Sequence, residues 1–91
     1  NYYCEIDQSH ESFISESTKK QYMEAHHIIP LKYQDKFDMN LDSLENMICL
    51  CPNCHKAIHY GNKEIRKDLL LKVLATKTNL KIDIDSLLKL Y

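Results

Sequence analysis

Short apolar segments flanked by polar stretches divide the first half of the chain. The segment 22–28 (YMEAHHI) predicts a strand, and Pro30 ends it because proline cannot donate a hydrogen bond to a sheet. The segment 47–50 (MICL) predicts a short buried strand. Between them, 30–46 is polar and rich in turn residues, so we expect a long loop with room for one helical turn.

The spacing becomes helical after Pro52. The segment NCHKAIHYG places His55 and His59 four residues apart, which puts them on one helix face. Gly61 follows as a typical residue just beyond a helix end, and Asn62 can cap a second helix. The apolar stripe of that helix, which predicts a packing surface, contains Ile65, Leu69, Leu70, Val73 and Leu74.

The two ends of the chain complete the predicted element order. Residues 1–21 show no regular pattern and predict an irregular segment, whereas 82–91 (IDIDSLLKLY) predicts a short closing helix. The fold class is therefore α+β, with the order loop, strand, loop, strand, helix and further helices. The 91 residues form one domain, 1–91, in which burial alone leaves a thin stability margin. An additional staple is expected.

The composition excludes some classes of partner. Hydrophobic residues make up 44% and charged residues 27%, and 12 basic against 13 acidic residues give a net charge of −1. This balance does not favour wholesale electrostatic binding of nucleic acid or membranes, so any polyanion site must be local. We find no apolar run of the ~20 residues that a membrane span needs and no signal peptide, and we expect a cytoplasmic protein. The chain begins with Asn, so we expect a piece of a longer protein.

Three of the four cysteines lie together in CLCPNC at 49–54. Without an export signal, this crowding favours reduced thiols and a metal over disulfides. Cys51 and Cys54, three residues apart on a tight turn, can both reach one tetrahedral zinc ion. Cys4 supplies a third thiolate from the N-terminal segment. Cys49 is expected to be a small buried apolar residue.

The fourth zinc ligand has two candidates, Asp7 and His10. Imidazole suits zinc better than carboxylate does, which favours His10. Asp7 would then accept a hydrogen bond from this histidine. The favoured zinc ligands are Cys4, His10, Cys51 and Cys54.

The remaining histidines predict a second metal site. His55 follows Cys54 directly, and adjacent helical residues point about 100° apart, so His55 is poorly placed to share the zinc ion. It shares a face with His59 instead. On a strand, His26 and His27 cannot both face the helix. One of them can join His55 and His59 on a divalent ion, while the other takes a proton from water beside a substrate phosphate.

These residues resemble a known family. EAHHIIPL and LENMICLCPNCHKAIHYG, within residues 24–61, are similar to the HNH nuclease motif with its ββα-metal fold. The opening CEIDQSHESF and the closing RKDLLLKVL and DIDSLLKLY also resemble bacterial HNH domains of the McrA-like restriction type. By this resemblance 1–21 is a zinc-binding segment and 62–91 a helical extension. The sequence departs from the commoner pattern at Asp7, where a second cysteine is usual, so the fourth zinc ligand stays open.

The resemblance also implies the roles of the site residues. His27 is the general base, His26 is a catalytic metal ligand, and Asn46 braces the loop that orients His27. His55 is the last motif histidine, and His59 completes the catalytic metal site. The implied protein is a DNA endonuclease of a restriction or defence system with a structural Zn²⁺ and one catalytic Mn²⁺, Ni²⁺, Co²⁺ or Mg²⁺ ion.

Other expectations concern DNA and the alternative function. Specificity would come from another domain of the full-length protein. Candidate phosphate contacts are Lys32, Lys36, Lys56, Lys63, Arg66 and Lys67. The alternative is a catalytically inactive, zinc-stapled binding module, although such a scaffold has no need for the complete histidine set. A classical zinc finger is excluded because its cysteine and histidine pairs are about twelve residues apart, whereas His55 directly follows Cys54 here.

Overall fold

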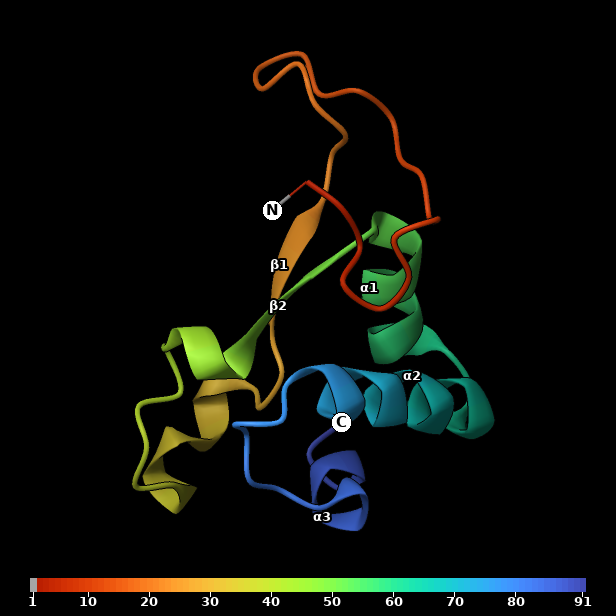
Figure 1. Cartoon of the computed structure of the whole chain (residues 1–91). Coiled ribbons are helices and arrows are strands. Elements are labelled where there is room, and N and C mark those ends of the chain that lie inside the picture. Colours follow the sequence, from red (N-terminus) through yellow and green to blue (C-terminus); the bar gives the residue numbers. More distant parts are fainter. Residues whose placement is uncertain (1) are drawn as a thin grey trace.

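The computed structural model describes residues 2–91 and contains a small antiparallel sheet followed by helices (Figure 1). Strand β1 (Glu24–His27) pairs with β2 (Met47–Leu50), and α1 (Pro52–Tyr60) follows β2 directly. The register places His26 opposite Ile48. This strand, strand, helix unit confirms the predicted α+β class and the ββα arrangement.

Two further helices extend this unit. Helix α2 (Lys63–Thr76) runs across the end of α1, and α3 (Ile84–Leu88) packs against α2 (Figure 1). Each begins at a residue whose side chain accepts a backbone hydrogen bond: Asn62 from the amide of Ile65 and Asp83 from that of Ser86. The cap at Asn62 was predicted from the sequence, and α3 is shorter than the predicted segment 82–91.

Strand β1 is also shorter than the predicted 22–28. The amide of Tyr22 donates to the carbonyl of Phe13, and the two rings stack with centroids 4.8 Å apart. An isolated bridge joins Ile14 to Gln21 beside them. Tyr22 therefore belongs to a hairpin-like excursion of the N-terminal segment, which projects from the body of the molecule (Figure 1).

The connection between the strands contains two 3₁₀ helices rather than one helical turn. They are η1 (Leu31–Lys36) and η2 (Leu44–Asn46). Gln34 holds the turn after η1, because its amide donates to the carbonyl of Met39 and its oxygen accepts from the amide of Leu41. The predicted loop is therefore a compact, hydrogen-bonded segment.

Gly61 ends α1, as predicted, but not through a left-handed conformation. Its φ is −67°, which any residue can adopt. The reason for glycine is space, because a Cβ at this position would lie 2.5 Å from the carbonyl oxygen of Ala57. The chain can therefore turn sharply from α1 into α2.

The core lies between the sheet, the helices and the loop. Alternate residues of each strand point inward, so His26, Ile48 and Leu50 are buried, whereas Ala25 is exposed. Among residues 2–91, the fully buried aliphatic side chains are Ile28, Ile29, Leu41, Ile48, Leu50, Ile58, Leu70, Val73 and Leu87. Strand β2 and helices α1, α2 and α3 contribute buried side chains to this core, and η1 borders it through Tyr33. In residues 2–91, the helices are too short or too polar to span a lipid bilayer.

The buried position predicted for Cys49 is wrong. Cys49 lies on the same sheet face as Ala25 and Met47 and is only half-buried. Its amide donates to the Glu5 carboxylate at 2.7 Å, and its carbonyl accepts from the Glu5 amide at 2.9 Å. The side chain points away from the core because strand alternation gives the inward positions to Ile48 and Leu50.

Candidate metal centres and active site

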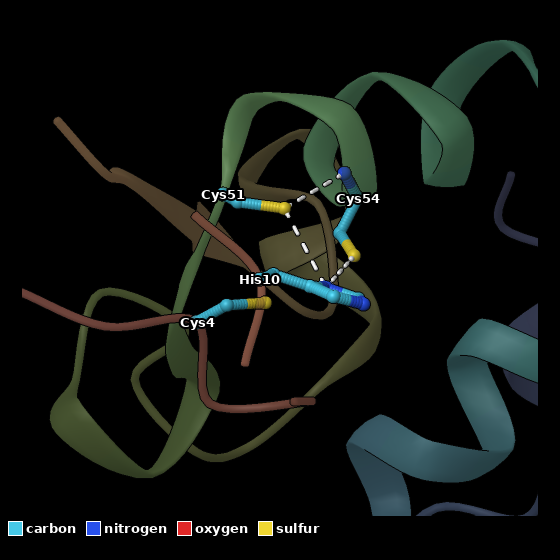
Figure 2. A group of neighbouring side chains, drawn as sticks. All are labelled: Cys4, His10, Cys51 and Cys54. Atoms are coloured by element: carbon cyan, nitrogen blue, oxygen red, sulfur yellow. Dashed lines mark hydrogen bonds between the residues drawn. The ribbon is translucent and has the colours of Figure 1, made fainter. Parts of the chain in front are cut away.

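Cys4, His10, Cys51 and Cys54 point toward one common centre, as Figure 2 shows. One ligand atom from each of them lies within 4.8 Å of all the others. Nδ1 of His10 is 3.3 Å from Sγ of Cys54 and 3.8 Å from Sγ of Cys51. The sequence predicted this group, and its three sulfurs and one imidazole nitrogen are a donor set that could hold zinc.

Helix α1 fixes the positions of Cys51 and Cys54. Cys51 is the residue that caps the helix, Pro52 occupies the first turn, and the amide of Cys54 donates to Sγ of Cys51 at 3.4 Å. Cys4 reaches the same centre because Glu5 pairs with the backbone of β2. The cluster therefore joins the N-terminal segment to the start of α1.

The electrostatics of the thiols also fit a cation. Burial opposes ionisation of Cys4, but hydrogen bonds from the surrounding backbone and from the His10 ring lower its pKa to about 7. Burial raises the pKa of Cys54, and hydrogen bonding and charge at Cys51 and Cys4 raise it further. Three thiolates so close together require a compensating positive charge.

Asp7 lies outside this centre. Its carboxylate accepts hydrogen bonds from the hydroxyl and amide of Ser9, which lower its pKa. Its other oxygen is 3.5 Å from Nε2 of His10. The structure thus brings His10 rather than Asp7 to the cysteines, with Asp7 behind the imidazole.

A second group contains His26 of β1 and His55 and His59 of α1. One ring nitrogen of each lies within 4.8 Å of the others, and the three ring centroids are 5.0 Å apart in every pair. Two histidines come together because they are four residues apart on a helix, and the third because alternation turns His26 toward that helix. The sequence predicted all three members.

The environment of His26 and of His59 favours the neutral imidazole, which is the form that binds metals. Burial, followed by the charges of His55, His59 and His27, lowers the pKa of His26 to about 3. Burial also lowers the pKa of His59, and His55 adds to the effect. Three nitrogen donors of this kind suit Mn²⁺, Co²⁺, Ni²⁺ or Zn²⁺ better than Mg²⁺.

Glu24 is a site residue that sequence reasoning missed. Its Oε1 is 2.8 Å from Nδ1 of His55, and its Oε2 accepts from the Tyr22 hydroxyl at 2.9 Å. The hydrogen bond from His55, and then that from Tyr22, lower the pKa of Glu24. Strand alternation was the available signal, because residues 24 and 26 share one face. The carboxylate leaves Nε2 of His55 for other contacts.

His27 lies on the opposite face of β1 from His26, as predicted. Its Nε2 is 2.9 Å from Oδ1 of Asp42 in the loop between the strands. Sequence reasoning missed Asp42, because a loop of this length gives no signal of which side chain returns to the strand. The two histidines of β1, those of α1 and Leu31 border one open groove.

Tyr91 is a second residue that was missed. Its hydroxyl lies 2.6 Å from Nε2 of His26 and also donates to the carbonyl of Ile28. Burial raises the pKa of Tyr91, so the hydroxyl keeps its proton. Nothing in the sequence spacing indicates this contact, since 65 positions separate Tyr91 from His26.

Asn46 is fully buried, and its side chain is hydrogen-bonded to the backbone of Ile29 and of Leu41.

The candidate phosphate contacts differ in their exposure and hydrogen bonds. Arg66 donates from Nη2 to the carbonyls of His59 and Gly61, at 3.1 and 3.2 Å, so it closes the end of α1. The five lysines of the set are exposed: Lys32, Lys36, Lys56, Lys63 and Lys67.

The fold and the two side-chain clusters define a small ββα domain with two groups of side chains that could each hold a metal ion. The sequence model of the HNH endonuclease family matches residues 4–62, and the chain belongs to this family. The chain is also 37% identical over 54 residues to the type IV methyl-directed restriction enzyme EcoKMcrA of Escherichia coli (strain K12). This similarity covers 57% of the chain and 18% of the relative, so the chain spans less than a fifth of the relative's length.

Proposed function

We propose that this chain is a metal-dependent DNA endonuclease domain that hydrolyses phosphodiester bonds in a restriction or defence protein. The observation that carries the proposal is the convergence of His26, His55 and His59 beside His27, with ligand atoms within 4.8 Å of one another. Three metal-type nitrogens next to a separately held imidazole support a hydrolytic site more than a binding surface.

His27 is the proposed general base. A carboxylate only accepts hydrogen bonds, so contact with Asp42 requires the proton of neutral His27 to be on Nε2. Nδ1 then carries a lone pair that can take a proton from water. Asp42 also fixes the orientation of the ring and stabilises the imidazolium that forms, which is the usual contribution of such a carboxylate.

His26, His55 and His59 are the proposed ligands of the catalytic ion. A divalent ion bound there supplies positive charge that stabilises the developing charge on the scissile phosphate and the leaving 3′ oxygen. Two features hold these ligands in place. Glu24 is hydrogen-bonded to His55, and His26 is buried against α1. Asn46 contributes by bracing the loop that carries Asp42.

Cys4, His10, Cys51 and Cys54 are the proposed ligands of a structural Zn²⁺. Their position supports this division of labour, because they join the N-terminal segment to the start of α1. Two members of the imidazole group, His55 and His59, lie further along the same helix. Zinc bound by the four ligands would fix the start of α1 and, through it, the position of His55.

DNA is proposed as the substrate on family grounds, and restriction on the similarity to EcoKMcrA. The near-neutral charge supports few phosphate contacts, which the exposed lysines would supply. Because the relative is much longer than this chain, we assign target specificity to another domain. The alternative, an inactive zinc-stapled module, has no use for the His27–Asp42 pair or the imidazole group.

The test is incubation of the purified 91-residue chain with supercoiled plasmid and a panel of divalent ions, beside His27→Ala. The proposal predicts metal-dependent nicking or linearisation that His27→Ala loses while it keeps its fold. Exposed Lys89→Ala, outside the groove, should retain activity. A folded, metal-bound chain without cleavage under every ion would favour the inactive module.

A further inference from the structure

The hydroxyl of Tyr91 makes two hydrogen bonds that together determine which nitrogen of His26 carries the proton. One contact is with Nε2 of His26 at 2.6 Å, and the other is with the carbonyl oxygen of Ile28. A carbonyl can only accept, so the single hydroxyl proton goes to Ile28. The hydroxyl must then accept from His26, and Nε2 of His26 is the donor.

A neutral imidazole that donates from Nε2 has its lone pair on Nδ1. We propose that Tyr91 is a positioning residue of the imidazole metal site, which holds His26 as the Nε2–H tautomer and leaves Nδ1 as its ligand atom. This inference rests on the proposed metal site and deepens it, because it names the coordinating atom and the residue that selects it.

The hydrogen bonds of His55 and of His26 fix opposite tautomers of the two imidazoles. His55 donates from Nδ1 to Glu24, which leaves Nε2 as its ligand atom. His26 has the reverse arrangement. Metal-binding histidines commonly donate their second ring N–H to a carboxylate, a carbonyl or another acceptor, which fixes the ring and its tautomer. A tyrosine hydroxyl that is itself anchored on a backbone carbonyl fills this role for His26.

The ring of Tyr91 adds a packing contribution. Its centroid is 5.9 Å from that of His26 and 6.1 Å from that of His59, so it borders two members of the group. Helix α3 delivers Tyr91 to this place, because the chain leaves α3 with the amide of Tyr91 bonded to the carbonyl of Leu88. The C-terminal end lies in the middle of the molecule (Figure 1), and there the Tyr91 hydroxyl reaches His26.

The experiment reads the tautomer and the affinity separately. Long-range ¹H–¹⁵N correlation spectra of the labelled 91-residue chain report which ring nitrogen of His26 is protonated. The chain is first loaded with one equivalent of Zn²⁺ at the cysteine cluster, and a second equivalent is then titrated. Calorimetry measures the affinity of the second site in wild type, Tyr91→Phe and the control Tyr60→Phe, whose ring contacts His59 but is exposed.

The inference predicts an Nε2–H tautomer for His26 in wild type and a zinc-dependent shift at Nδ1. Tyr91→Phe should show mixed tautomers and bind the second zinc ion about 10–100-fold more weakly, while Tyr60→Phe matches wild type. A proton on Nδ1, a zinc-dependent shift at Nε2, or unchanged tautomer and affinity in Tyr91→Phe would overturn it. The wild-type spectrum decides even if Tyr91→Phe does not fold. Absence of any second zinc site in wild type would instead contradict the proposed function.

Discussion

The side chain of Asn46 pairs with the backbone of Ile29 through two hydrogen bonds. Its Oδ1 accepts from the Ile29 amide at 2.8 Å, and its Nδ2 donates to the Ile29 carbonyl at 2.9 Å. Nδ2 also donates to the carbonyl of Leu41 at 2.8 Å. Asn46 thereby closes the loop between the strands from the inside. It also holds Asp42, the residue after Leu41, within reach of His27.

Asn46→Ala should lower the free energy of unfolding by about 3 kcal/mol, because buried backbone groups left without partners cost ~1–3 kcal/mol each and do not add fully. The measurement is urea denaturation followed by circular dichroism. Asn79→Ala, at an exposed position, is the matched control and should change stability by less than about 0.5 kcal/mol. Equal stability of the two variants would show that the loop does not depend on Asn46.

Local spacing was sufficient to predict part of each cluster, whereas the choice of His10 over Asp7 stayed open. Cys51 and Cys54 on a turn, and His55 and His59 on one helix face, follow from local spacing. Strand alternation required only that one of His26 and His27 face the helix, and the resemblance to HNH nucleases implied His26. The two pairs could be predicted because helix and turn geometry fix the direction of each side chain, and the structure brings them together.

The partners of these residues could not be predicted in the same way. Asp42 reaches His27 through a folded loop, and Tyr91 reaches His26 through the packing of α3 on α2. Such contacts depend on tertiary structure that no spacing rule encodes. Glu24 is the intermediate case, since alternation placed it on the same face as His26 but its contact with His55 required the helix position.

Removal of zinc should unfold the domain. Structural zinc contributes on the order of 10 kcal/mol to the folding of small domains. We expect Cys51→Ser/Cys54→Ser to lose the bound metal and cooperative melting, and a strong chelator at elevated temperature to do the same to wild type. Cys49→Ser is the control, because Cys49 lies outside the cluster. Wild type without bound zinc, or unchanged melting of the double variant, would contradict the staple.

Acid should destabilise helix α3 through Asp83. Hydrogen bonds from the Ser86 amide and hydroxyl lower the pKa of the Asp83 carboxyl below its value in the unfolded chain. The stabilisation is therefore present above the unfolded pKa of about 4 and is lost as the pH falls through the lower folded value. Asp83→Asn keeps an acceptor that does not titrate, so its stability should fall less than that of wild type between about pH 5 and pH 2. Asp35→Asn should follow wild type; a parallel loss in Asp83→Asn would refute the cap effect.

The nitrogen-rich site should select its catalytic ion. Magnesium prefers oxygen ligands and releases water reluctantly, whereas manganese, cobalt and nickel accept imidazole more readily. We expect faster plasmid nicking with nickel, cobalt or manganese than with magnesium at equal low concentration. Replacement of a nitrogen by a carboxylate in His26→Asp should shift the preference toward magnesium. Best activity of wild type in low magnesium, with no relative gain for His26→Asp, would show that His26 is not a ligand of that ion.

The division of labour between His27 and its neighbours is the central claim. His27→Ala should keep the fold and both metals and lower the cleavage rate by ~10²–10⁴, because it removes a general base. His59→Ala should weaken binding of the catalytic ion, so excess metal should restore part of its activity. The most direct measurement is a plasmid-cleavage time course for both variants over a range of metal concentration, with bound metal determined in parallel. The predicted result is full metal binding without rescue for His27→Ala and metal-dependent rescue for His59→Ala; equal metal loss and equal rescue in the two variants would contradict it.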